Sequence, residues 1–264
     1  ASRRLDARVV VVGNITVGGT GKTPLVLALT RRLREAGFRV GILTAGYRGR
    51  RKTWPVQVSA ASDPGQVGDE PVLLARNSAA AVYAGPDRVA AGRALLASSP
   101  CDVLICDDGL QHYALRRDLE IAVVDAGRGH GNGHCLPAGP LREPVSRLNT
   151  VDALVYLGEP APGAFGMQLE LHSATRLCDP GDTRPLASFR GEPVHAVAGI
   201  GHPQRFFAAL RSAGQEVEEH RFPDHHRVRA VDLEFGDRRT ALMTEKDAVK
   251  RSSFAPAHWW SVAA

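Results

Sequence analysis

The sequence predicts an α/β protein in which a doubly wound, mostly parallel sheet is followed by a second, smaller α/β domain. Apolar runs of strand length alternate with segments of helix length along the first 157 residues. Between residues 159 and 193 the composition shifts toward Pro, Gly and short polar pieces, and the alternation then resumes. Strands that alternate with helices are typical of a parallel sheet whose faces are covered by helices.

The elements of the first domain are expected from the spacing of their apolar residues. Strands are predicted at residues 9–12, 39–43, 54–59, 80–84, 102–106, 119–124 and 152–157. Helices are predicted at residues 24–33, 69–76, 87–97 and 141–148.

The smaller domain is expected to contain strands at residues 194–198, 216–222, 240–243 and 259–262 and a helix at 203–213. We therefore expect a first domain at residues 1–164, a linker segment at 165–192 and a C-terminal α/β domain at 193–264.

The composition excludes several classes of protein. The chain has 264 residues, of which 44% are apolar and 23% charged, with a mild net charge of +5. Its arginines are scattered and aromatic residues make up only 6%, whereas nucleic-acid binding favours a concentrated basic stripe with aromatics. The four cysteines lack zinc-type spacing, which indicates reduced thiols in a cytosolic compartment. No signal peptide or long apolar span is expected.

The segment GNITVGGTGKTP, residues 13–24, follows the first predicted strand directly and predicts a phosphate-binding loop of the P-loop NTPase type. Lys22 is expected to reach the β- and γ-phosphates, and Thr23 to ligate Mg²⁺. The strict pattern requires glycine at the position of Thr16, so a glycine-rich loop without a ligand is the alternative. The candidate nucleotide-binding residues are Thr16, Gly18, Gly19, Thr20, Gly21, Lys22, Thr23 and Pro24.

A second motif, VLICDDGLQHY at residues 103–113, has the form of a Walker-B element. Asp107 and Asp108 end a buried strand, where two adjacent carboxylates repel each other and a divalent cation would relieve the repulsion. The alternative is that one of them only caps the turn before Gly109. His112 follows five residues after Asp107; an isolated histidine is usually structural, and the functional alternative is that it meets a phosphate beside the metal edge.

Three further polar stretches have both a functional and a structural interpretation. Asp69 starts a predicted helix, His225 follows Pro223 and Asp224, and Arg142 follows a rigid turn. The structural alternatives are that Asp69 is only an N-cap, that His225 is only a loop residue and that Arg142 is only a solvated charge. A histidine from the second domain that polarises Asp69 would let this carboxylate take a proton from a sugar hydroxyl.

Seven segments in order closely resemble the tetraacyldisaccharide 4'-kinase family of lipid A biosynthesis: GNITVGGTGKTP, GDEPVLLA, CDDGLQH, GNGHCLPAGPLRE, VAGIGHPQRFF, FPDHH and MTEKDAVK. They span nearly the whole chain, and Thr16 is itself part of the resemblance. The resemblance implies an ATP-dependent kinase that phosphorylates the 4'-hydroxyl of a tetraacylated glucosamine disaccharide 1-phosphate and forms lipid IVA. It implies ATP and Mg²⁺ as cofactors.

The resemblance also implies roles for individual residues. Asp69 is similar to the family's catalytic base and His225 to its partner, and catalytic positions are matched by Lys22, Arg88 and Arg142. The implied metal site comprises Thr23, Asp107, Asp108 and Glu143. Tyr47, Gln111 and His112 are expected near the substrate.

The family resemblance further implies an acylated lipid substrate, contact with an anionic membrane surface, and a place at the cytoplasmic face of the bacterial inner membrane. Neither a nucleic acid nor an obligate protein partner is expected. The chain departs from the family at Ala45, where an arginine usually precedes Gly46 and Tyr47, although Arg48 and Arg50 lie nearby. The family's N-terminal membrane-anchoring helix is not found in this sequence.

Two alternatives from other classes stay open at this point. A P-loop GTPase switch would normally carry an Asn-Lys-x-Asp loop, and the chain offers only Thr244-Glu245-Lys246-Asp247, which has the wrong spacing. A kinase acting on a soluble sugar or cofactor is the second alternative.

Overall fold

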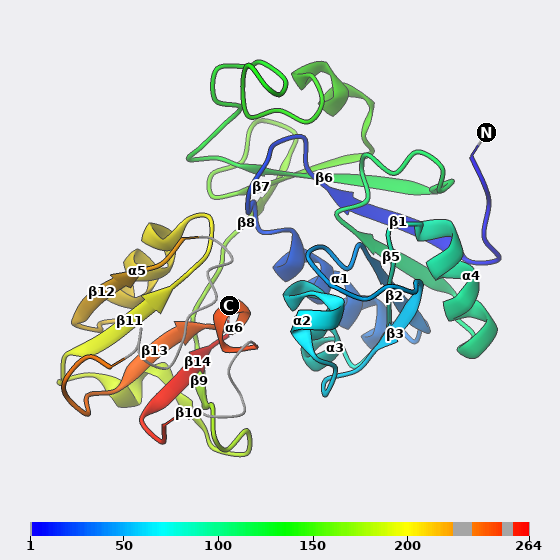
Figure 1. Cartoon of the computed structure of the whole chain (residues 1–264). Helices are drawn as coiled ribbons and strands as arrows, with labels where there is room; N and C mark the ends of the chain where they lie inside the picture. The colour runs from blue at the N-terminus through cyan, green and yellow to red at the C-terminus, as the bar shows by residue number, and fades with distance from the viewer. Residues whose placement is uncertain (1, 224–233, 250–255, 264) are drawn as a thin grey trace. The chain divides into compact units, whose positions relative to one another are not determined.

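The computed structural model describes residues 2–223, 234–249 and 256–263. The chain forms two compact units, Ala1–Gln168 and Leu169–Ala264, each with its own sheet (Figure 1). The predicted fold class, a doubly wound and mostly parallel sheet with a second, smaller α/β unit, is confirmed.

The first sheet contains eight strands in the order β3-β4-β2-β5-β1-β6-β7-β8. All neighbours are parallel except β3 and β4. The strands are β1 (Arg8–Gly13), β2 (Val40–Thr44), β3 (Val56–Val58), β4 (Ala81–Ala84), β5 (Val103–Asp107), β6 (Leu119–Asp125), β7 (Ala153–Leu157) and β8 (Phe165–Met167). Because β1 and β5 are central and parallel, their C-terminal ends lie side by side and bring residues 13 and 107 to one edge.

Helices cover both faces of this sheet (Figure 1). The helix α1 (Lys22–Glu35) packs on β1 and β5, and α3 (Asp69–Asn77) packs beside it. The helix α4 (Arg88–Ser98) packs on β2 and β4 from the other face, where Val89 and Leu95 join Val9 and Val11 in one buried cluster. Burial of valine and leucine side chains from both layers stabilises the sheet. A short helix, α2 (Pro64–Val67), precedes α3.

The helix predicted at residues 141–148 is wrong. Residues 140–142 are extended and pair with the loop after β1, and a 3₁₀ helix, η1 (Val145–Thr150), begins only after Pro144. Proline favours extended backbone in the residue before it and lacks an N–H group, so the segment cannot form one continuous helix through Pro144.

The second unit contains a six-stranded sheet in the order β10-β9-β14-β13-β11-β12. Its strands are β9 (Ser173–Arg176), β10 (Thr183–Pro185), β11 (Val194–Ala198), β12 (Val217–Arg221), β13 (Ala241–Thr244) and β14 (Trp259–Val262). Its helical elements are η2 (Leu186–Phe189), α5 (Pro203–Ser212) and α6 (Glu245–Ala248). The segment 165–192, expected as a linker, includes β8 of the first sheet and β9 and β10 of the second.

Within the described parts of the chain, none of the helices is both long and apolar enough to cross a membrane.

Candidate active site

The loop between β1 and α1 is shaped by glycine. Gly18 and Gly21 have φ angles of 93° and 88°, in the left-handed region that favours glycine. Gly21 caps the N-terminus of α1, and a side chain on Gly19 would meet no atom within 4 Å. The backbone therefore leaves open space beside a helix N-terminus, the arrangement that binds phosphate.

Lys22 is the first residue of α1 and is held inward by two contacts. Its Nζ donates to Asn14 Oδ1 at 3.0 Å and lies 3.4 Å from Asp108 Oδ1. Asn14 in turn donates to Thr16 Oγ1 at 3.2 Å. Thr16 thus supports the lysine indirectly, which gives this departure from the general P-loop pattern a structural reason.

Two buried oxygen atoms in this region have no hydrogen-bond partner among the described residues: Thr20 Oγ1 and Asp107 Oδ1. Asp107 is almost fully buried. Burial, together with the charges of Glu70 and Asp108, raises the pKa of Asp107 to about 7. An unpartnered carboxylate oxygen at the end of a parallel strand, together with the half-buried hydroxyl of Thr23 at the start of α1, is a donor set that suits Mg²⁺.

Asp108 is in a different environment from Asp107. Its φ angle is 50°, and both carboxylate oxygens accept from Arg142 Nη1 at 2.9 Å. Burial raises the pKa of Asp108, but Lys22 and Arg142 outweigh this effect and hold it below its ordinary value. Asp108 is therefore a charged carboxylate that links the phosphate-loop lysine to an arginine.

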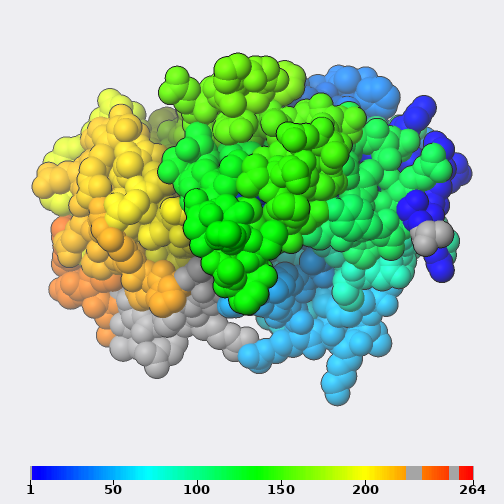
Figure 2. All heavy atoms as spheres, turned by 90° about the horizontal axis from the view of Figure 1, so that it is seen from above, coloured from blue at the N-terminus to red at the C-terminus, as the bar shows by residue number. Residues whose placement is uncertain are grey.

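Arg142 reaches the site because its segment pairs with the phosphate loop. The Arg142 N–H donates to the Ile15 carbonyl at 2.6 Å, and the Val17 N–H donates to the Pro140 carbonyl at 2.8 Å. The rest of the segment between β6 and η1 lies largely at the surface of the first unit (green in Figure 2). The sequence singled out Arg142 as a candidate but did not predict the strand-like pairing that positions it.

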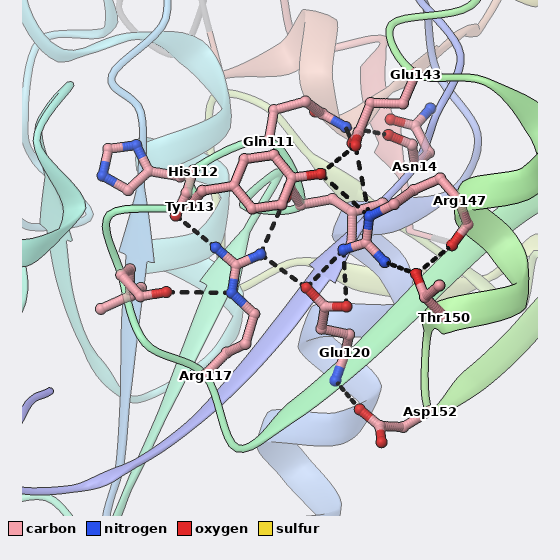
Figure 3. A network of polar contacts seen from close by, with 12 residues as sticks. Asn14, Gln111, His112, Tyr113, Arg117, Glu120, Glu143, Arg147, Thr150 and Asp152 are labelled. Atoms are coloured by element: carbon pink, nitrogen blue, oxygen red, sulfur yellow. Dashed lines mark hydrogen bonds and ion pairs between the residues drawn. The ribbon is translucent and has the colours of Figure 1, made fainter. Parts of the chain in front are cut away.

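Glu143 lies in a polar network that connects the loop after β1 with Glu120 (Figure 3). Gln111 donates from Nε2 to Glu143 Oε1 at 2.6 Å and to the Asn14 carbonyl at 3.0 Å. The Tyr113 hydroxyl donates to Glu143 Oε2, and Arg147 Nε lies 3.4 Å from the same oxygen.

The network continues through Glu120, whose two carboxylate oxygens accept from Arg147 Nη2 at 2.7 Å. Arg117 donates to Glu120 Oε1 at 2.7 Å, and its guanidinium lies 5.2 Å from the centre of the Tyr113 ring (Figure 3). Two arginines and two glutamates thus compensate one another's charges and fix the Tyr113 ring.

Arg88 and His112 lie together at the start of α4. The Arg88 N–H donates to His112 Nε2 at 3.3 Å, and its guanidinium donates to the Gly85 carbonyl at 2.8 Å. Burial and the Arg88 charge lower the pKa of His112, and the same positive charge opposes the rise in the pKa of Asp107. Arg88 thus supplies a buried positive charge to the carboxylate edge.

Asp69 is the first residue of α3, directly after Gly68, whose φ angle is 97°. A side chain at Gly68 would come within 2.7 Å of the Tyr47 carbonyl oxygen, so only glycine allows this approach. The Tyr47 ring is 62% exposed, with the Arg48 guanidinium 5.6 Å from its centre. Glu70, next to Asp69, acts electrostatically on Asp107, so the start of α3 lies near the carboxylate edge.

Sequence reasoning missed Arg128. Its Nη1 donates to the Val17 carbonyl at 2.7 Å inside the phosphate loop. Asp125, the last residue of β6, accepts from the Gly127 and Arg128 N–H groups and shapes this turn. The signal was present in the sequence, because Asp125 ends an apolar run as Asp107 does.

His225 lies outside the described residues.

Comparisons with known proteins agree with one another. A family model described as Tetraacyldisaccharide-1-P 4'-kinase matches residues 1–264. The tetraacyldisaccharide 4'-kinase of Nitrosococcus oceani is 54% identical over 258 residues, covering 98% of this chain and 76% of that protein. That of Pseudomonas aeruginosa PAO1 is 50% identical over 263 residues, covering 98% and 79%. The chain also resembles a crystal structure of the "apo" form of LpxK from Aquifex aeolicus in complex with ATP, with a TM-score of 0.78 and 30% identity over 99% of this chain and 84% of that one.

Proposed function

The chain belongs to the tetraacyldisaccharide-1-P 4'-kinase family, and from this premise we propose how its residues carry out the reaction. The activity is ATP-dependent phosphorylation of the 4'-hydroxyl of a tetraacyldisaccharide 1-phosphate. A nucleotide switch and a kinase for another acceptor are not favoured, since relatives at 50–54% identity are tetraacyldisaccharide 4'-kinases.

The observation that carries the proposed mechanism is the convergence of Lys22 and Arg142 on Asp108 beside the glycine loop. Two positive charges from separate segments are held where the loop N–H groups would cradle the phosphates. We assign Lys22 and Arg142 to the charge of the transferred phosphoryl group, and Asp108 to holding both side chains in position. Thr16, Gly18, Gly19, Thr20, Gly21 and Pro24 line the proposed nucleotide loop.

In the proposed chemical step, the acceptor's 4'-oxygen attacks the γ-phosphorus, the bond to the β,γ-bridging oxygen breaks, and ADP leaves. Asp69 takes the proton of the attacking hydroxyl, with His225 assigned as its partner by the family resemblance. Arg88 and His112 are assigned to the phosphates, and Tyr47 and Gln111 to the substrate side. Most of the catalysis is positioning and charge compensation, because phosphoryl transfer needs little covalent chemistry from the protein.

We assign Mg²⁺ to Thr23 and Asp107 and, by the family resemblance alone, to Glu143, whose two oxygens also accept from Gln111 and Tyr113. When bound, the ion supplies charge neutralisation for the β- and γ-phosphates. The unpartnered Asp107 Oδ1 supports this assignment, whereas both Asp108 oxygens accept from Arg142. We therefore propose Asp107 as the metal ligand and Asp108 as a positioning residue.

Apparent Mg²⁺ affinity in the kinase assay tests this division of roles. We expect Asp107→Asn to raise the Mg²⁺ concentration needed for half-maximal activity by about tenfold or more, because a ligand is lost. Asp108→Asn should lower kcat at saturating Mg²⁺ and leave the Mg²⁺ requirement within about twofold. The opposite pattern would assign the metal to Asp108.

We further propose that the enzyme works at an anionic membrane surface, on the cytoplasmic face of the inner membrane. The acylated substrate and the exposed Arg3, Arg4 and Arg8 support this, although Asp118 lies within 3.8 Å of Arg4 and 3.5 Å of Arg8. Flotation with anionic vesicles at low salt should recover the protein. Replacing the three arginines with serine, or using zwitterionic vesicles, should abolish recovery; equal recovery would refute the electrostatic contact.

A further inference from the structure

The second unit contains a cluster of two histidines and a glutamate that the kinase mechanism does not use. His195 on β11 is the register partner of Glu218 on β12, and His220 follows two residues later on the same face of β12. His195 Nδ1 lies 2.8 Å from His220 Nε2. The Glu218 carboxylate lies 3.9 Å from His195 Nδ1 and 3.8 Å from His220 Nε2.

These distances are close to those of a metal site. With Zn–N bonds of about 2.0–2.1 Å, two nitrogen ligands of a tetrahedral zinc lie ~3.3 Å apart. The two imidazole nitrogens would need to separate slightly, and the carboxylate would need to approach by a similar amount. Two imidazole nitrogens and one carboxylate oxygen form a donor set that binds Zn²⁺ in preference to Mg²⁺ or Ca²⁺.

The surroundings of the cluster orient its ligands. Asp237 Oδ1 lies 3.0 Å from His195 Nε2, and a carboxylate that accepts from this nitrogen leaves the Nδ1 lone pair facing the cluster. Arg239 binds both carboxylates, with Nε 2.7 Å from Asp237 Oδ2 and Nη2 2.6 Å from Glu218 Oε2. Metal-ligating histidines commonly donate their other ring N–H to a carboxylate in this way.

One side of the cluster is apolar and the other is open. The Phe235 ring stacks on His220 with centroids 3.9 Å apart and lies 4.3 Å from His195, which is only 1% exposed. The Glu218 side chain is half exposed, so an ion and its water can enter there.

We propose that His195, His220 and Glu218 bind one Zn²⁺, with Asp237 as the positioning residue for His195 and water in the fourth position. The ion ties β12, the last strand in the described sheet order, to β11. Its role is structural stabilisation of the second unit, independent of the kinase reaction.

Zinc binding to the full chain tests the proposal. The metal-stripped protein is titrated with Zn²⁺ against a chromophoric chelator, with Mg²⁺ in excess to occupy the carboxylate edge of the first unit. We expect one tight site in the wild type and in the control His172→Ala, which removes an exposed histidine of the same unit. His220→Ala and the exposed Glu218→Gln should each weaken binding at least ~10-fold, and Asp237→Asn should weaken it by ~10–100-fold.

Thermal unfolding separates a zinc site from a hydrogen-bonded pair of histidines that only joins the two strands. The proposal predicts that Zn²⁺ raises the Tm of the wild type and of His172→Ala but not of His220→Ala. It is overturned if Zn²⁺ leaves the wild-type Tm unchanged, or if wild type and Glu218→Gln bind Zn²⁺ equally tightly. Because Glu218 is exposed, that variant tests the site without removing a buried side chain.

Discussion

At the scale of single residues, the adjacent Asp107 and Asp108 at the end of β5 have different environments because their neighbours differ. Asp108 accepts from Arg142 and lies near Lys22, while Asp107 is almost fully buried with one oxygen unpartnered. The sequence could predict that both lie at the strand end, since DD follows an apolar run. It could not distinguish them, because Arg142 arrives from a distant segment.

The buried charge of Asp107 predicts an unusual dependence of stability on pH. Its folded pKa of about 7 lies above the ordinary 3.8, so its contribution to stability is present at low pH and is lost as the pH rises through 7. In EDTA at pH 8, Asp107→Asn should therefore raise the free energy of unfolding by about 1–3 kcal/mol. The gain should shrink toward pH 5, as urea denaturation at the two pH values would measure.

Asp102 provides a control, because its contribution to stability depends on pH in the opposite direction. The Arg39 hydrogen bond lowers the pKa of Asp102 to about 2, so its contribution is present above pH 4 and is lost as the pH falls through 2. Asp102→Asn should destabilise the protein at pH 7 and much less at pH 2. A destabilising Asp107→Asn at pH 8 without metal would contradict the assigned environment.

At the scale of elements, the long helices and the strands β1 to β7 of the first unit were predictable, whereas β8 and the segments that complete the candidate site were not. The apolar runs of β1, β5 and β6 are buried on both faces and could be located from sequence alone. Residues 141–148 were predicted as one helix, but Leu141 is buried beside the phosphate loop instead. Tyr113 and Arg147 gain their roles only through that tertiary pairing.

Tyr113 on the loop after β5 and Arg147 on η1 both contact Glu143, so removing the Tyr113 hydroxyl should loosen the proposed Mg²⁺ site. Tyr113→Phe deletes the donor to Glu143 Oε2; burial and Glu143 raise the pKa of this phenol, which keeps it protonated. We expect the Mg²⁺ concentration for half-maximal activity to rise by about tenfold, with kcat at saturating Mg²⁺ within about twofold. Steady-state kinetics over a Mg²⁺ series measures both.

Tyr83→Phe is the matched control, because the Tyr83 hydroxyl donates to Ser98 Oγ on α4 and touches none of these residues. An unchanged Mg²⁺ requirement in Tyr113→Phe, or an equal change in Tyr83→Phe, would show that the network does not position Glu143.

The start of α3 should depend strongly on Gly68. Gly68→Ala introduces a Cβ that would lie 2.7 Å from the Tyr47 carbonyl, at a φ angle of 97°. We expect the free energy of unfolding to fall by about 1–3 kcal/mol, together with a loss of activity through the displaced Asp69. Urea denaturation and the kinase assay give the two readouts.

Gly37→Ala is the control that separates backbone strain from a steric clash of the new Cβ. Gly37 has a φ angle of 90°, but no atom lies within 4 Å of its Cβ position. Gly68→Ala should be the more damaging of the two, and only this variant should lose activity beyond its loss of stability. Equal losses of stability and activity in the two variants would show that the clash with the Tyr47 carbonyl does not matter.

At the scale of the whole molecule, the alternation of strands and helices predicted two α/β units, and the structure divides the chain after Gln168. The short strands β9 and β10 escaped prediction because their sequences, SATR and TRP, are short and mostly polar and lack an apolar alternation. The acceptor's identity also could not come from general P-loop chemistry; it came from segments distributed over both units.

The most direct test of the account is transfer of radiolabel from the γ-phosphate of ATP to tetraacyldisaccharide 1-phosphate in detergent. We expect the wild-type chain to label the lipid at its 4'-position and Asp69→Asn to lose at least ~10³-fold in kcat, about 4 kcal/mol of transition-state stabilisation. Asp63→Asn, which alters only the cap of α2, should retain activity. Lipid labelling by Asp69→Asn at the wild-type rate would contradict the account.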